Sequence, residues 1–315
     1  MSRAARTALA LTALPLVTAC TPRDPAGASS TPPGATAPPG APSAPAAEPA
    51  AERAEDPARE PVIEVAHTGG LLTPERLAAR LPLVSVHADG RVITPGPQIQ
   101  VFPPPALPAL QVQHVDEDAV PVLVERALRA GVGGSADLGR PPVADLPSTR
   151  FTVRTPGGTQ VREVYALGAE APPGPGSGLT ADQLAARAEL QALVRELGEP
   201  ASVLPGDAVG EEEIYVPEAV AGVVTEWRDP GGGPGSGPEP RPVPWPGPPL
   251  PGEPLEPRLG LSCVLATGEH ARAVLDAAVA ADALTPWVSE DDRRWSVALR
   301  PLLPHEEDCA DLAGY

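Results

Sequence analysis

The chain has 315 residues but contains no lysine and no asparagine, and all 23 of its basic residues are arginine. The absence of lysine excludes a Schiff-base lysine and a lysine general base. The absence of asparagine excludes an Asn-linked glycan and an asparagine that orients a catalytic histidine. These absences remove several kinds of enzyme site before any motif is considered.

Positive charge is scarce along the whole chain. The 23 arginines are outnumbered by 41 acidic residues, which gives a formal net charge of −18 with histidine neutral. A surface of this sign repels the phosphates of nucleic acids and the head groups of anionic lipids. We therefore expect no nucleic-acid partner and no electrostatic attachment to a membrane.

The first residues have the pattern of an export signal. Arg3 and Arg6 open the chain, an apolar run extends from Leu9 to Val17, and small residues follow. This is the order of a positive region, a short apolar region and a cleavage point. The apolar run is shorter than the about 20 residues that span a bilayer, and Pro15 interrupts it. The pattern therefore predicts a cleaved signal and not a permanent membrane span.

The signal ends in Val17-Thr18-Ala19-Cys20, which resembles the lipobox of bacterial lipoproteins. In that family the cysteine thiol is acylated with diacylglycerol and the chain is cut before it, so residues 1–19 would be the signal peptide. The alternative is an ordinary secretory signal cleaved near Ala19. With 46 prolines and no lysine, the chain resembles uncharacterised lipoproteins of GC-rich actinobacteria. The resemblance implies a place at the outer face of the cytoplasmic membrane, and no activity.

Cleavage before Cys20 would remove Arg3 and Arg6 and bring the net charge to about −20. Such a chain is repelled by anionic lipids, so acyl chains on Cys20 would have to hold it at the membrane. One acyl chain gives marginal binding, whereas two or more give stable anchoring. A diacylated cysteine meets this requirement.

Composition divides the rest of the chain into segments. Residues 20–60 are rich in proline and alanine and lack the apolar side chains that would offset the entropy of ordering, so we expect a disordered tether. Residues 61–228 are expected to form one domain. Residues 229–258 are rich in proline and glycine and are expected to be a linker or long loop. Residues 259–315 are expected to form a small α+β segment that packs on the preceding domain.

Hairpins and helices alternate in the folded segments without a sustained βαβ pattern. Asp89-Gly90 supplies the turn of one predicted hairpin, and Thr180 with Gln183 forms a capping box that opens a helix. The predicted hairpins cover residues 83–93, 150–167 and 286–303, and the predicted helices cover 116–130, 180–198 and 267–281. The pattern favours an α+β fold in which helices pack on one face of antiparallel hairpins.

Cys263 and Cys309 are the two cysteines that remain once Cys20 is assigned to the lipid. An even pair in an oxidising compartment is more often bridged than free. We therefore expect a disulfide between them. The alternative is a buried free thiol at Cys263 and an exposed one at Cys309.

No residue is assigned a catalytic role, and no metal or cofactor is expected. Residues 305–308 read His-Glu-Glu-Asp, but adjacent side chains cannot all point at one ion, so a solvated acidic tail is the preferred interpretation. His87 lies beside a hairpin turn and is expected to be a surface or half-buried residue. The Gly-x-Ser-x-Gly pattern at 174–178 lies in a linker and not between a strand and a helix, so it fails as a nucleophile elbow.

Trp287 and Trp295 flank the last predicted hairpin and have two interpretations. Core packing is the simpler one. The second is a stacking platform that contacts a ligand such as a wall glycan or a peptide.

These observations support three hypotheses about function. The first is a membrane-anchored extracytoplasmic lipoprotein that serves as a binding or accessory module in the cell envelope, with an envelope protein or wall glycan as its partner. The second is a hydrolase of wall material whose site is assembled from distant Asp, Glu or His residues. The third is a structural partner of an exported complex. Nothing in the sequence decides among them.

Overall fold

The computed structural model describes residues 59–169, 178–229 and 240–312, all within one compact unit of the chain that extends over residues 53–315. The described residues form 13 strands in two sheets, together with four α-helices. This is the α+β class that the sequence predicts. Cys20 and the predicted tether, apart from its last two residues 59 and 60, lie outside the described residues.

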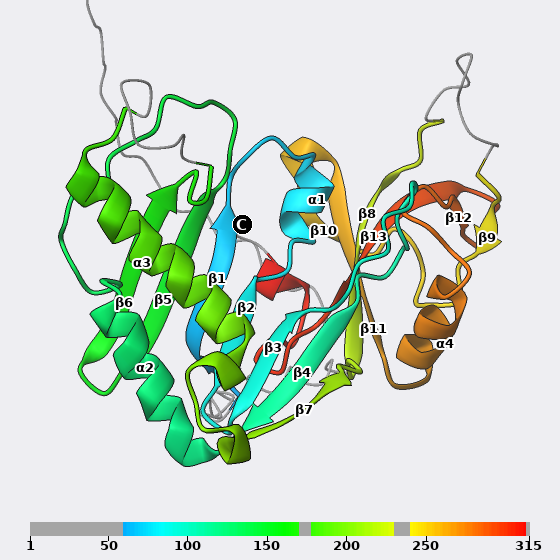
Figure 1. The fold of residues 1–315 in the computed structure, drawn as a ribbon. Coiled ribbons are helices and arrows are strands. Elements are labelled where there is room, and N and C mark those ends of the chain that lie inside the picture. Colours follow the sequence, from blue (N-terminus) through cyan, green and yellow to red (C-terminus); the bar gives the residue numbers. More distant parts are fainter. Residues whose placement is uncertain (1–58, 170–177, 230–239, 313–315) are drawn as a thin grey trace, which may run out of the picture. The chain divides into compact units, whose positions relative to one another are not determined.

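The first sheet has seven antiparallel strands in the order β6-β5-β1-β2-β3-β4-β7 (Figure 1). Its strands are β1 (Pro61–Thr68), β2 (Val84–His87), β3 (Arg91–Pro95), β4 (Leu110–Val115), β5 (Ser148–Thr155), β6 (Gly158–Tyr165) and β7 (Val209–Ile214). Two of the three predicted hairpins, β2–β3 and β5–β6, lie in this sheet. The structure adds β1 between them, and β4 and β7 along one side.

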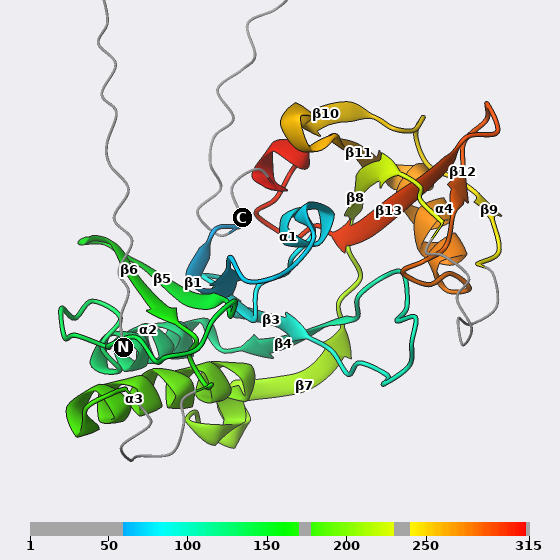
Figure 2. The same ribbon diagram turned by 90° about the horizontal axis from the view of Figure 1, so that it is seen from above.

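Two helices cover one face of the first sheet, and Figure 2 shows both on the same side of its strands. They are α2 (Val120–Arg129), which follows the 3-10 turn η1 (Glu117–Ala119), and α3 (Ala181–Gly198). The predicted capping box opens α3, since the backbone N–H of Gln183 donates to Thr180 Oγ1 and the backbone N–H of Thr180 donates to Gln183 Oε1. The apolar side chains of the strands that face these helices make the largest core cluster of the chain.

The C-terminal segment covers the opposite face of the first sheet. Because strand side chains alternate between faces, Ile63 and Val65 join the core beneath the helices, whereas Glu64 points to the other side. There Leu303 packs against Ile93 and its neighbours on β3 and β4. The first sheet is therefore buried on both faces along its central strands.

The second sheet has six strands in the order β10-β11-β8-β13-β12-β9, antiparallel except for the β12–β9 pair. Its strands are β8 (Ala219–Glu226), β9 (Val243–Pro244), β10 (Glu253–Glu256), β11 (Leu261–Thr267), β12 (Trp287–Val288) and β13 (Arg294–Pro301). Helix α4 (Gly268–Ala278) packs on one face, and the short α1 (Pro74–Ala78) meets the other. The remaining 3-10 turns are η2 (Pro200–Ser202), η3 (Gly206–Ala208), η4 (Pro257–Leu259) and η5 (Cys309–Leu312).

The boundary between the sheets differs from the boundary that composition suggested. It falls between β7 and β8, so β8 belongs with the later segment and not with residues 61–228. The short strands β9 and β10 lie within the stretch 229–258 that is expected to be a linker or long loop. The reason is physical: β8 is flanked by β11 and β13 and is buried on both faces, and such central pairing is set by partners that are distant in sequence.

Candidate functional site

A cluster of polar side chains lies between the first sheet and the C-terminal segment. It brings together Glu64 from β1, His87 from β2 and His305 from the segment after β13. His305 Nε2 is 3.8 Å from Glu64 Oε2, and the ring centroids of His87 and His305 are 5.8 Å apart. Two neighbouring strands near the start of the described chain therefore meet a segment from its other end at this point.

A buried ion pair holds the start of the C-terminal segment in place. Two guanidinium nitrogens of Arg300 donate to the two carboxylate oxygens of Glu306, one of them over 2.6 Å, and both side chains are buried. The same carboxylate accepts a hydrogen bond from the backbone N–H of Leu303, and Arg300 Nε donates to the backbone carbonyl of Arg80. A buried charge needs such bidentate pairing, because desolvation alone would be prohibitive.

Burial controls the protonation of the cluster. Desolvation lowers the pKa of His87 to about 4, and desolvation raises the pKa of the Glu64 carboxyl above its ordinary value against the opposing charges of His305 and Arg154. His87 Nδ1 lies 2.7 Å from the backbone carbonyl of Arg59 and therefore donates to it. At neutral pH the imidazole of His87 is uncharged and its Nε2 is an acceptor.

Three buried polar atoms in this cluster have no hydrogen-bond partner among the described residues. They are Ser85 Oγ, His87 Nε2 and His305 Nδ1. Serine, histidine and glutamate are also the residue types of a nucleophile, a base and an acid. However, Ser85 and His87 are fully buried, so a substrate cannot reach them as the protein stands. Bound water is the ordinary partner of such atoms.

A cavity of about 480 Å³ lies beside the cluster. Its lining residues are Arg59, Arg91, Tyr215, Val216, Glu218, Ala219, Thr267, Leu302, Leu303, Pro304, Glu306 and Glu307. Several of its polar groups are engaged within the protein: Arg91 pairs with Asp89 over 2.7 Å, and the hydroxyl of Tyr215 donates to the carbonyl of Leu302. Burial raises the pKa of Tyr215 to about 12, so its hydroxyl stays protonated.

A second concavity of about 290 Å³ has an apolar lining. Its lining residues are Pro105, Leu107, Pro108, Ala109, Leu110, Ile214, Tyr215, Pro217, Leu275, Ala278, Val279 and Pro301. We call it the apolar groove. Ile214 at the end of β7 is 81% exposed and Val279 after α4 is 88% exposed. Large apolar side chains gathered at a concave surface are typical of a binding site.

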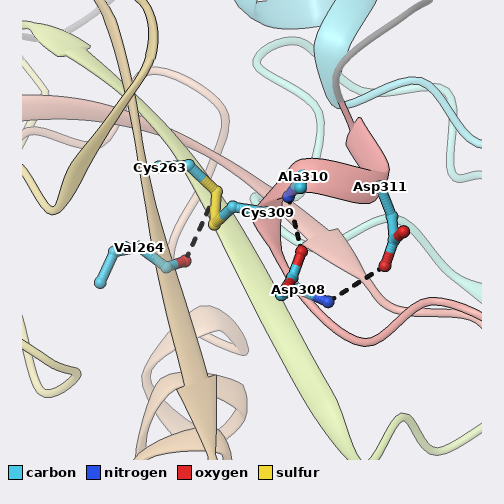
Figure 3. The surroundings of a disulfide bond; sticks show 6 residues. All are labelled: Cys263, Val264, Asp308, Cys309, Ala310 and Asp311. Atoms are coloured by element: carbon cyan, nitrogen blue, oxygen red, sulfur yellow. Dashed lines mark hydrogen bonds between the residues drawn. A yellow bond between two sulfur atoms is a disulfide. The ribbon is translucent and has the colours of Figure 1, made fainter. Parts of the chain in front are cut away.

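The structure joins Cys263 and Cys309 in a disulfide, as the sequence predicts (Figure 3). Cys263 lies on β11 and Cys309 opens η5, with their Cα atoms 6.0 Å apart. Next to the bond, the N–H of Ala310 donates to the carboxylate of Asp308. The disulfide ties the C-terminal segment, which covers the first sheet, to a strand of the second sheet.

The structure corrects the ligand-contact interpretation of Trp287 and Trp295. The two residues lie directly opposite each other on β12 and β13, and both are buried. Trp287 meets the ring of Trp245 edge-on, with centroids 5.3 Å apart. Both side chains therefore serve the core of the second sheet and offer no stacking platform at the surface.

Two other expectations are wrong. His87 is fully buried and not half-exposed, because the C-terminal segment covers the face of β2 on which it lies. Glu306 is not part of a solvated acidic tail, since it pairs with Arg300 in the interior. Ser85 and His87 alternate with Val84 and Val86, which signals a strand. This alternation does not indicate which segment covers the polar face of the strand.

Among the described residues, no group of three or more His, Cys, Asp or Glu side chains is placed to hold a metal ion. In the same part of the chain, no helix is both long and apolar enough to cross a membrane. Comparisons of the chain with protein-family models, with curated proteins and with solved structures yield no match.

Proposed function

We propose that the chain is a membrane-anchored extracytoplasmic lipoprotein that acts as a binding or accessory module of the cell envelope. The observation that carries the proposal is the disulfide between Cys263 and Cys309. Disulfides of this kind persist in oxidising compartments outside the cytoplasm. The bond also accounts for two of the three cysteines, so Cys20 in its lipobox is the one left for acylation.

The apolar groove supports a role in binding. Ile214 and Val279 expose most of their apolar surface to water beside a concave apolar lining, although the chain as a whole is strongly acidic. Burying such surface against a partner is favourable by roughly 25 cal/mol per Å². The buried tryptophans weigh against a wall-glycan platform, so the groove favours a protein partner.

A hydrolase of wall material is the second candidate function. The meeting of Glu64, His87 and His305 from distant segments is the arrangement that this hypothesis requires. Release of soluble fragments from isolated cell wall by the purified chain, lost in Glu64→Gln, would establish it. The burial of Ser85 and His87 favours the binding role instead.

A third candidate function is that of a structural partner of an exported complex. Crosslinking in the envelope followed by co-purification would separate it from the binding role.

The anchoring proposal is tested by the change Cys20→Ser. The variant should leave the membrane fraction, because lipid is the only attachment that a chain of about −20 net charge can use. Fractionation in low and high salt, followed by immunoblotting, measures this. The matched control is Cys309→Ser, which changes a cysteine but should remain in the membrane fraction. Cys20→Ser that stays membrane-bound in high salt would overturn the proposal.

A further inference from the structure

Strand β7 is an open edge of the first sheet. Within the described ranges it pairs with β4 on one side only, and the residues from Gly210 to Ile214 are all exposed. An edge strand presents unpaired backbone N–H and C=O groups, which another extended chain can use. The apolar groove begins where β7 ends, because Ile214 contributes to its wall.

The register of the β4–β7 pair shows which backbone groups are available. The N–H of Tyr215 donates to the carbonyl of Leu110, so Tyr215 directs its backbone groups toward β4. Backbone direction alternates along a strand, so the N–H and C=O of Glu212 and Ile214 point away from the sheet. These groups form the start of a ladder for a further strand.

The charge of β7 decides what can pair with it. Three consecutive glutamates, Glu211, Glu212 and Glu213, occupy the strand, and it carries no basic residue. A second copy pairing through its own β7 would bring like charges together, which is destabilising. Residues 21–58 are also net acidic, so the chain's own tether is a poor occupant. A positively charged segment is therefore the partner whose charge complements β7.

We propose that β7 and the apolar groove bind an extended, basic segment of another exported protein. The segment adds to the sheet edge as an eighth strand, with arginine or lysine beside Glu212 and Glu213 and an apolar side chain beyond Ile214 in the groove. Main-chain hydrogen bonds give affinity in this mode of recognition, and side chains give specificity. The inference rests on the binding role proposed above, and it names the partner's chemistry.

The test uses the full mature chain in detergent and a labelled synthetic ten-residue peptide. In this peptide two adjacent arginines follow a leucine, and the other positions are threonine and valine. Fluorescence anisotropy should show saturable binding that weakens as salt is raised. The variant Glu211→Gln/Glu212→Gln/Glu213→Gln should bind roughly tenfold more weakly, because it removes the charge partners of the two arginines. Ile214→Ser and Val279→Ser should each weaken binding without changing its salt dependence.

Two controls separate this mode from general attraction to an acidic protein. The variant Glu117→Gln/Glu125→Gln/Glu253→Gln removes the same charge from exposed residues elsewhere and should bind like the unaltered chain. A peptide methylated on alternate backbone nitrogens keeps its arginines but cannot form a ladder, and it should not bind. Equal binding of the methylated peptide would overturn strand addition. Equal weakening by the control variant would overturn the assigned site.

Failure of the inference is distinguishable from failure of the proposed function. If no peptide binds but Cys20→Ser leaves the membrane, the docking site is wrong and the anchored lipoprotein remains. If sedimentation shows that the unaltered chain self-associates and Glu211→Gln/Glu212→Gln/Glu213→Gln does not, the occupant of the edge is a second copy. That outcome would overturn the choice of partner.

Discussion

At the scale of single residues, the buried ion pair stays charged whereas the buried histidine stays neutral. Arg300 and Glu306 remain charged because each satisfies the other in the interior. His87 has no such partner and is held neutral by desolvation. Both arrangements depend on the C-terminal segment staying closed over the first sheet, so both can be tested through stability.

Glu306→Gln should destabilise the fold by about 3–5 kcal/mol, because it leaves the guanidinium of Arg300 buried without a charge partner. Chemical denaturation measures the free energy of unfolding. Glu125→Gln, at an exposed site on α2, is a matched control, and its effect should stay within about 0.5 kcal/mol. Equal effects of the two changes would mean that the ion pair does not hold the segment.

Stability should fall as the pH is lowered from about 6.5 to about 4, because the unfolded chain takes up a proton at His87 that the folded chain excludes. The full difference for this residue is roughly 3 kcal/mol. The raised pKa of Glu64 acts in the opposite direction. The lowered pKa of His67, which burial also causes, adds to the effect of His87.

The measurement is the free energy of unfolding at several pH values between 4 and 7. His87→Gln keeps a donor for the carbonyl of Arg59 but does not titrate, so it should reduce the slope. His270→Gln, which changes an exposed histidine, is the matched control. An unaltered slope in His87→Gln would assign the pH dependence to other groups.

At the scale of elements, the sequence predicts structures that depend on neighbouring residues but not strand pairings between distant segments. The capping box of Thr180 and Gln183 and the Asp89-Gly90 turn act within a few residues, so the sequence alone was enough to predict α3 and the β2–β3 hairpin. By contrast, β8 became a central strand only through β11 and β13. The Glu64–His305 contact likewise depends on tertiary folding, which leaves no spacing signal in the sequence.

Strand β7 supplies the prediction at this scale. Replacing its three glutamates by glutamine should raise self-association, since charge on an edge strand opposes edge-to-edge pairing. Sedimentation velocity over a range of protein concentrations measures the change. The three-residue control at Glu117, Glu125 and Glu253 loses as much charge and should stay at the association state of the unaltered chain. Association of the control as well would assign the effect to net charge.

At the scale of the whole molecule, the C-terminal segment bridges the two sheets and a disulfide holds that segment in place. The segment after β13 packs on the first sheet, and the disulfide fastens it to β11 in the second. Removing the bond should therefore weaken the attachment of the segment and the stability of the entire fold together.

Cys309→Ser should lower the free energy of unfolding by about 4 kcal/mol, because the disulfide closes a loop with a sequence separation of 46 residues. Denaturation of the unaltered protein with and without reductant gives an independent measure of the same quantity. The reduced protein and the variant should agree, and reductant should not affect the variant further. No loss of stability in either case would mean that the bond does not constrain the chain.

If the chain is exported as proposed, the cover of the first sheet has a consequence for the order in which it folds. Arg300 reaches the backbone of Arg80 across 220 residues, so the face built early in the chain is closed by residues made late. A chain that crosses a membrane from its amino end would expose Glu64, Ser85 and His87 until its last segment arrives. Contacts of such long range slow folding. Under the proposed export, completion of the fold would therefore be tied to completion of transport.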